Sequence, residues 1–151
     1  MFEFHAGYVY ADDTTRRLSF ADRNDDTGRH YFVMDRSEES PEECVADMGN
    51  VYIERDDQGW GGYGGIDLVI LNRESLTLEL GPRMATRMGG HETLRVTFRI
   101  KDAQFRELRQ VLGFIMLGYE SQLEVHADRS ESNEESVVFS VYETPTAGGS
   151  G

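Results

Sequence analysis

The chain has 151 residues, of which 38% are hydrophobic and 11% aromatic, a composition that predicts one folded domain with a substantial core. Its 28 acidic and 15 basic residues give a net charge of −13, which argues against direct binding of DNA, RNA or anionic lipid. No apolar run is long enough to span a membrane, the first residues lack a signal-peptide pattern, and the single cysteine, Cys44, excludes an internal disulfide. We therefore expect a soluble protein of the reducing cytoplasm.

The acidic residues are concentrated in two blocks. Residues 35–57 hold nine acidic residues against two arginines, a net charge of −7, and residues 118–151 carry −6. Residues 58–117 between them carry +2. Such asymmetry indicates an interaction surface for a basic protein partner, although the charge by itself is equally consistent with a purely solubilising role.

The first half of the chain predicts strands separated by polar turns. Aromatic side chains stand at alternate positions of residues 2–10, as in a half-buried strand. Three further strands are predicted at residues 17–20, 30–34 and 50–54. The acidic stretch 37–47 predicts a short helix that begins near Pro41.

The second half begins with a glycine-rich loop, residues 59–65, and a clear hairpin. The next elements are predicted at residues 66–71 and 76–80 (strands of that hairpin), 82–88 (a short helix) and 94–100 (a strand with one apolar and one basic face). An apolar stripe at helical spacing then predicts a long helix with Asp102 as its N-cap and Gly118 at its end. Residues 123–126 and 137–142 predict a final hairpin.

This order of elements predicts an α+β fold. We expect a mostly antiparallel sheet, one long amphipathic helix packed on a face of it, and a short second helix. Residues 1–144 are expected to form a single domain, and residues 145–151 a flexible tail.

The glycine-rich loop, GWGGYGG, contains the spacing of a phosphate-binding loop at Gly59, Gly61 and Gly64. A dinucleotide site requires a helix directly after these glycines, whereas a strand follows here. A kinase loop requires a strand lysine and a P-loop requires Gly-Lys-Ser/Thr, yet the only lysine of the chain is Lys101. We therefore predict no phosphate binding. The rings of Trp60 and Tyr63 either fold back onto the sheet or point outward as anchors of a protein interface.

Residue types that build catalytic or metal sites are scattered. The four histidines do not cluster, and Cys44 lies among acidic residues that keep its thiol protonated. Asp67 interrupts a strand of buried type, so it either faces an edge or pairs with an arginine. We expect no metal, no cofactor and no enzymatic activity.

A series of short motifs runs through the middle of the chain. They lie at residues 31–36, 38–47, 48–52, 63–66, 76–80, 89–90 and 94–100, followed by the long helix. The pattern is similar to the immunity protein 10 family over about residues 30–117, most sharply at Tyr63-Gly64-Gly65 with Arg36 upstream. The sequence departs from that family at Trp60-Gly61-Gly62, which is inserted, and in the segment after Gly118.

The resemblance implies a small bacterial protein that neutralises the toxin domain of a polymorphic toxin system. Such a protein would bind its cognate toxin stoichiometrically, and acidic residues would steer it toward a basic partner. We expect Arg36 to form an internal ion pair with a nearby carboxylate. The expected partner-binding residues are Glu38, Glu39, Glu42, Glu43, Asp47, Asp56, Asp57, Trp60 and Tyr63. The alternative is a small-ligand sensor or an enzyme that uses a cleft beside the glycine-rich loop.

Overall fold

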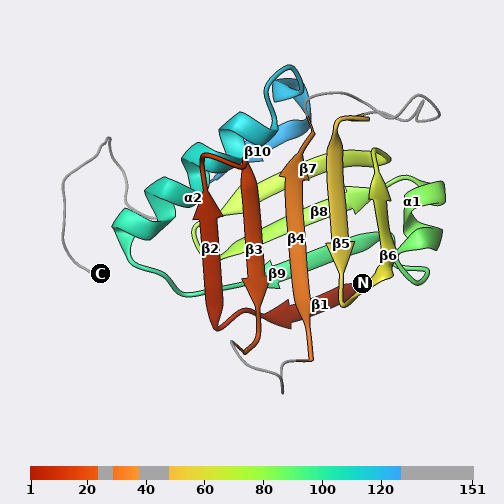
Figure 1. Ribbon diagram of the computed structural model, residues 1–151, viewed down its shortest axis with the longest axis horizontal. Coiled ribbons are helices and arrows are strands. Elements are labelled where there is room, and N and C mark those ends of the chain that lie inside the picture. The colour runs from red at the N-terminus through yellow and green to blue at the C-terminus, as the bar shows by residue number, and fades with distance from the viewer. Residues whose placement is uncertain (24–28, 38–47, 127–151) are drawn as a thin grey trace.

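Two five-stranded sheets packed face to face form the body of the protein, and their strands cross at a steep angle (Figure 1). The structure is a computed structural model, and it describes residues 1–23, 29–37 and 48–126. The antiparallel sheet has the order β2-β3-β4-β5-β6. Its strands are β2 (Tyr8–Asp12), β3 (Arg17–Ala21), β4 (Tyr31–Arg36), β5 (Val51–Arg55) and β6 (Asp57–Tyr63).

The second sheet, here the mixed sheet, has the order β1-β9-β8-β7-β10. Its strands are β1 (Phe2–His5), β7 (Ile66–Asn72), β8 (Ser75–Leu80), β9 (Thr93–Thr97) and β10 (Leu123–Val125). The pairs β1–β9 and β7–β10 are parallel, and the pairs between them are antiparallel. The chain therefore starts in the mixed sheet, builds the whole antiparallel sheet, and then returns.

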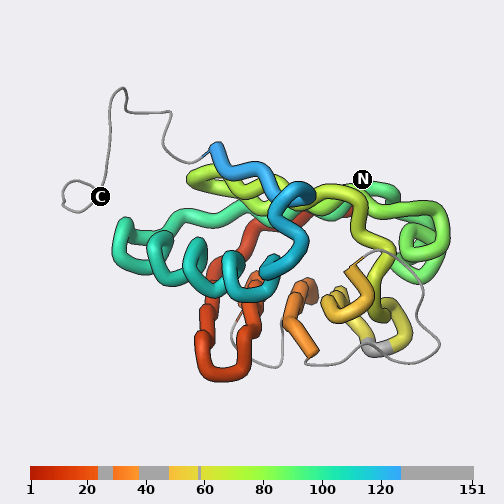
Figure 2. The backbone as a smooth tube through the Cα atoms, turned by 90° about the horizontal axis from the view of Figure 1, so that it is seen from above, coloured from red at the N-terminus to blue at the C-terminus, as the bar shows by residue number. Residues whose placement is uncertain are grey.

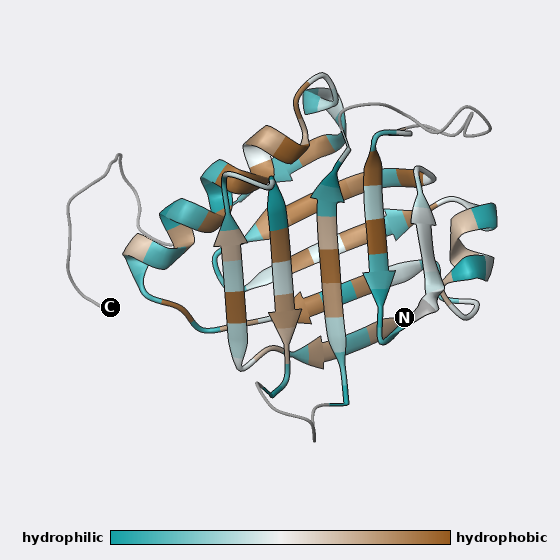
Figure 3. Ribbon diagram, viewed as in Figure 1, coloured by the Kyte–Doolittle hydropathy of each residue, from teal (hydrophilic) through white to brown (hydrophobic). Residues whose placement is uncertain are grey.

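Side chains that alternate along the strands fill the space between the sheets, visible as bands of hydropathy in Figure 3. Leu18 and Phe20 of β3 and Met34 of β4 point inward and are fully buried. The ring of Phe20 stacks on that of Phe98, which follows β9, with 5.9 Å between the ring centroids. One continuous apolar core thus joins the two sheets.

Within the described residues, two α-helices close the sides of the sandwich (Figures 1 and 2). The 14-residue helix α2 (Asp102–Ile115) lies beside β2, on the same side of the mixed sheet as the antiparallel sheet. It buries one stripe of side chains, Phe105, Leu108, Val111, Leu112 and Ile115. The short helix α1 (Pro82–Arg87) lies at the opposite side, against β6. A 3₁₀ turn, Glu120–Gln122, leads into β10.

The α+β class and the mainly antiparallel pairing agree with the sequence prediction, but the strands divide between two sheets. The strand expected at residues 2–10 breaks at Ala6 and Gly7, so β1 and β2 belong to different sheets. A side chain at Gly7 would approach the carbonyl oxygen of Asp22 to 2.9 Å, and the backbone passes closely only because Gly7 has none. The helix expected near Pro41 lies outside the described residues.

The start of α2 and the pairing of the last strand also differ from the prediction. Asp102 is the first helical residue, and Lys101 takes the N-cap position; its backbone amide donates to Oε1 of Gln104 at 3.1 Å. β10 pairs in parallel with β7, with Leu123 beside Val69, and not in the expected hairpin. Residues 137–142, the other half of that hairpin, and the tail 145–151 lie outside the described residues.

Candidate functional site

The glycine-rich segment is an edge strand and not a loop, which corrects the sequence prediction. Residues 57–63 form β6, which pairs with β5 so that Tyr63 lies beside Tyr52 and Gly61 beside Glu54. The turn follows at Gly64 and Gly65, which have φ values of 72° and 75° and carry the chain from one sheet to the other.

These glycines allow close packing against α1. A Cβ atom at Gly62 would lie 3.2 Å from Nη1 of Arg87, and one at Gly65 would lie 2.7 Å from Cβ of Met84. Nη1 of Arg87 donates to the carbonyl oxygen of Gly61 at 3.2 Å. Gly62 and Gly65 therefore serve the contact between this segment and α1.

A buried arginine lies behind β6. Arg55 is only 4% exposed, and its guanidinium lies between two aromatic rings, 4.2 Å from the centroid of Phe2 and 4.0 Å from that of Trp60. Nε and Nη2 donate to the carbonyl oxygen of Met88 at 3.0 and 2.8 Å. Nη1 donates to Oδ2 of Asp56 at 3.0 Å. The guanidinium is thus covered on both faces and bonded along its edge, the arrangement in which a buried arginine is stable.

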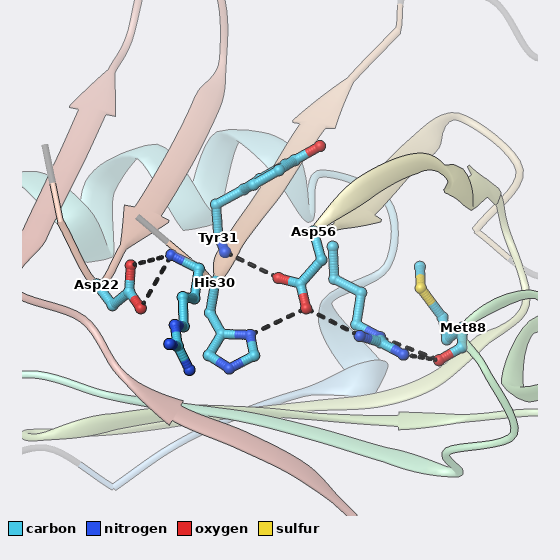
Figure 4. Close-up of polar contacts among 7 residues, drawn as sticks. Asp22, His30, Tyr31, Asp56 and Met88 are labelled. Carbon is cyan, nitrogen blue, oxygen red and sulfur yellow. Dashed lines mark hydrogen bonds and ion pairs between the residues drawn. The ribbon is translucent and has the colours of Figure 1, made fainter. Parts of the chain in front are cut away.

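Asp56 connects this arginine to β4 (Figure 4). Its Oδ1 accepts the backbone amide of Tyr31 at 2.9 Å, and its Oδ2 lies 3.0 Å from Nδ1 of His30. Asp56 has a φ of 63°, a left-handed conformation that aspartate tolerates better than most residues and that makes the tight β5–β6 turn. Its carboxylate is therefore committed to bonds inside the protein.

A cluster of tyrosines surrounds Glu54 on the outer face of the antiparallel sheet. The hydroxyls of Tyr31 and Tyr52 donate to Oε2 and Oε1 of Glu54 at 2.5 and 2.6 Å. The ring of Tyr63 lies 5.2 Å from that of Tyr52. Burial raises the pKa of both hydroxyl groups, and the hydrogen bond to Glu54 and its charge raise it further, for Tyr52 to about 12. These hydroxyls therefore stay protonated and hold the carboxylate in one orientation.

The same face continues to Asp35. Nη1 of Arg17 lies 3.7 Å from Oδ2 of Asp35, which is beside Tyr52 in the register of β4 and β5. Burial raises the pKa of the Asp35 carboxyl; Arg17 opposes this rise and Glu54 adds to it.

The structure brings only some of the predicted partner-binding residues together. Asp57 accepts the backbone amide of Gly59 at 2.7 Å. Trp60 is 41% exposed and its ring also covers Arg55, so it combines the two orientations that the sequence left open. Tyr63 is half-buried and belongs to the tyrosine cluster, while Asp56 faces the interior. Glu38, Glu39, Glu42, Glu43 and Asp47 lie outside the described residues, and the role of all nine in partner binding stays a prediction.

The internal ion pair expected for Arg36 stays a prediction, and the structure gives this arginine a further role. Nη1 of Arg36 donates to the carbonyl oxygens of Ile115 and Leu117, at 2.9 and 2.5 Å, and binds the end of α2. The buried pair is Arg55 with Asp56. The sequence did contain a signal, because Arg55 follows Val51 and Ile53 on the inward side of a predicted strand. Asp67 was expected either to face an edge or to pair with an arginine. It is exposed at a register shift in β7.

Among residues 1–23, 29–37 and 48–126, no group of three histidine, cysteine, aspartate or glutamate side chains could hold a metal ion. No helix in this part of the chain is long and apolar enough to cross a membrane. The outer face of the antiparallel sheet carries an ordered set of tyrosine and carboxylate groups.

Comparison with known proteins identifies the family. The family model described as immunity protein 10 matches residues 4–106, a range that starts earlier and ends earlier than the resemblance at residues 30–117. The matched range spans both sheets, from β1 through β9, and the first turn of α2. Neither the curated proteins nor the solved structures contain a match to this chain. The chain belongs to the immunity protein 10 family.

Proposed function

We propose that this protein is the inhibitor of a cognate bacterial toxin domain, which it neutralises by stoichiometric binding. The observation that carries the proposal is the family match over residues 4–106. The net charge of −13 supports a basic partner, because complementary charge accelerates encounter and selects against wrong partners.

Co-expression with the toxin domain encoded beside this gene tests the proposal. We expect the protein to restore growth of cells that express that toxin, and to form a complex with the purified toxin that saturates at a fixed molar ratio in isothermal titration calorimetry. An unrelated toxin serves as the control and is expected to remain active.

Titration of toxin activity separates a binder from an enzyme. A stoichiometric inhibitor leaves residual toxin activity that falls linearly with added protein until the binding ratio is reached. If a small fraction of that amount abolishes all activity, the protein acts catalytically and the proposal is wrong. If the two proteins form no complex, the proposal is also wrong.

A further inference from the structure

The outer face of the antiparallel sheet is rich in tyrosine. Five tyrosines point outward from it, Tyr8, Tyr10, Tyr31, Tyr52 and Tyr63. Figure 1 looks directly onto this face, and none of the described helices and strands covers it (Figures 1 and 2). Tyr8 and Tyr10 at its edge are 43% and 48% exposed. Tyrosine is among the side chains most enriched at protein interfaces, because it offers a large rigid ring and a polar group together.

The strand register places a carboxylate, Glu54, in the middle row of this face, on β5 beside the edge strand β6. Tyr10, Ser19, Val33, Glu54 and Gly61 form one row across all five strands. A second row contains Asp12, Arg17, Asp35, Tyr52 and Tyr63. The two rows carry three carboxylates against one arginine, so the face is acidic as well as aromatic.

Glu54 is oriented to receive a cation. Each of its oxygens accepts one tyrosine hydroxyl, and each carboxylate oxygen has a second lone pair. The neighbouring position on β6 is Gly61, where a Cβ atom would lie 2.9 Å from the hydroxyl of Tyr52. A guanidinium or ammonium group that reaches Glu54 would also lie beside the hydroxyl oxygens of Tyr31 and Tyr52, which can accept a hydrogen bond. Because the carboxylate is already fixed, little freedom is lost on binding.

The outer face of the mixed sheet carries different side chains from that of the antiparallel sheet. Its outward positions in the described strands include Thr77, Thr93, Thr97 and the pair of Arg95 with Glu3, but no tyrosine, tryptophan or phenylalanine. The outer face of the mixed sheet is acidic as well, because Glu79 and Glu124 also point outward from it. Its aromatic character, and not its charge, therefore distinguishes the face of the antiparallel sheet.

We propose that the outer face of the antiparallel sheet is the docking surface for a cationic segment of the toxin domain, with Glu54 as its central acceptor and Tyr8 and Tyr10 as anchors. The inference rests on the proposed function and assigns its binding surface. It shifts the centre of the predicted interface from the acidic segment 38–47 to the middle of the sheet.

Two matched substitutions test the surface against the purified toxin domain. Ser19→Arg puts a bulky positive group in the central row, whereas Thr93→Arg puts the same group in the mixed sheet, beside Glu79. Both positions are half-buried. We expect Ser19→Arg to raise the dissociation constant about thirtyfold or more, the effect of losing a hot spot, and Thr93→Arg to change it less than about threefold. Denaturant unfolding verifies that both variants fold.

Milder variants test the named contacts and apply even if Ser19→Arg does not fold. Tyr8→Ala with Tyr10→Ala removes two exposed rings, and Glu54→Gln removes the charge while keeping one acceptor oxygen. Each is expected to weaken binding about tenfold or more, and Glu54→Gln also to weaken its salt dependence. Glu79→Gln is the control on the other face.

If the wild-type protein binds the toxin and all these variants bind equally well, the docking surface is wrong and the proposed function stands. If the wild-type protein does not bind, the proposed function fails and this inference with it.

Discussion

At the scale of single residues, Arg55 joins three distant parts of the chain. It contacts Phe2 of β1, Trp60 of β6 and the carbonyl oxygen of Met88 after α1. A buried guanidinium is stable only while its charge and donors are matched, and here Asp56 supplies the charge. The residue therefore fixes the relative positions of both sheets and α1.

Replacing Arg55 with methionine removes the donors and leaves Asp56 without its cation. We expect Arg55→Met to lower the free energy of unfolding by about 3 kcal/mol or more, because an uncompensated buried charge remains. Urea denaturation measures the loss. Arg17→Met is the matched control: Arg17 is half-exposed and 3.7 Å from Asp35, so its loss is expected below about 1 kcal/mol. Equal losses would contradict the role given to Arg55.

The tyrosines around Glu54 predict an alkaline limit to stability. Their pKa values are raised in the folded protein, so folding favours the neutral hydroxyl. The resulting contribution to the free energy of unfolding is complete below the pKa of an unfolded tyrosine, about 10. It is lost as the pH rises towards about 12. We expect the free energy of unfolding to fall in this window, and to fall less in the double variant Tyr31→Phe and Tyr52→Phe. Denaturant unfolding between these pH values tests it, and an identical decline in wild type and variant would contradict it.

At the scale of the elements, α2 contributes its stability through one buried stripe. Leu108 is fully buried, whereas Gln110 is exposed on the same helix. Leu108→Ala is expected to lower the free energy of unfolding by about 2–5 kcal/mol, since it removes apolar contacts and leaves a cavity. Gln110→Ala is expected to change it by less than about 0.5 kcal/mol. A loss for Leu108→Ala as small as that of the control would contradict the packing of α2.

The crossover from β6 to β7 depends on a glycine for two separate reasons. Gly65 has a left-handed φ, and a Cβ atom there would lie 2.7 Å from Cβ of Met84. Gly90 has a similar φ of 88° but open space around it. Gly90→Ala is expected to cost about 1 kcal/mol from backbone strain alone, and Gly65→Ala about 1–3 kcal/mol more from the clash. Thermal unfolding of both variants separates the two effects; similar losses would show that α1 moves away freely.

Most elements were predictable from the sequence because they follow local patterns. The hairpin of β7 and β8 and the helix α2 show their period in consecutive residues, and Pro82 and Gly89-Gly90 mark the two ends of α1. The division into two sheets was not predictable, since the break between β1 and β2 depends on the contact of Gly7 with the distant Asp22. β6 was missed because its glycines have low strand propensity, and only pairing with β5 makes them a strand.

The candidate site was predictable only in part, because the pairing of separate strands brings its residues together. Trp60 and Tyr63 stood out as isolated aromatic residues among glycines, and both contact other aromatic or charged groups. The cluster around Glu54 was missed, because Tyr31 and Glu54 are 23 residues apart and meet only through the register of β4 with β5. The contact of Arg36 with the end of α2 was also missed, since a sequence does not show that an arginine meets a helix end.

At the scale of the whole molecule, the net charge of −13 predicts how the partner is found. We expect the association rate constant with a basic toxin domain to fall as salt rises, because the Debye length is about 8 Å at physiological ionic strength. Replacing Glu38, Glu39, Glu42 and Glu43 by glutamine is expected to slow association more than it speeds dissociation. Stopped-flow kinetics measures both rates. An association rate that does not depend on salt would contradict electrostatic steering.

The parallel pairing of β1 with β9 has a consequence for the order of events during synthesis. His5 and Thr97 are paired although 92 residues separate them, and the whole antiparallel sheet is made between them. On the ribosome, the first strand emerges long before its neighbour exists, and Arg55 lacks its acceptor until Met88 has been added. Non-local pairing of this kind makes folding slow, on the order of milliseconds to seconds. A newly made chain thus has the strands of the antiparallel sheet early but completes the contacts of Arg55 and the second sheet late. The proposed inhibitor would therefore reach its stable fold only once most of the chain has left the ribosome.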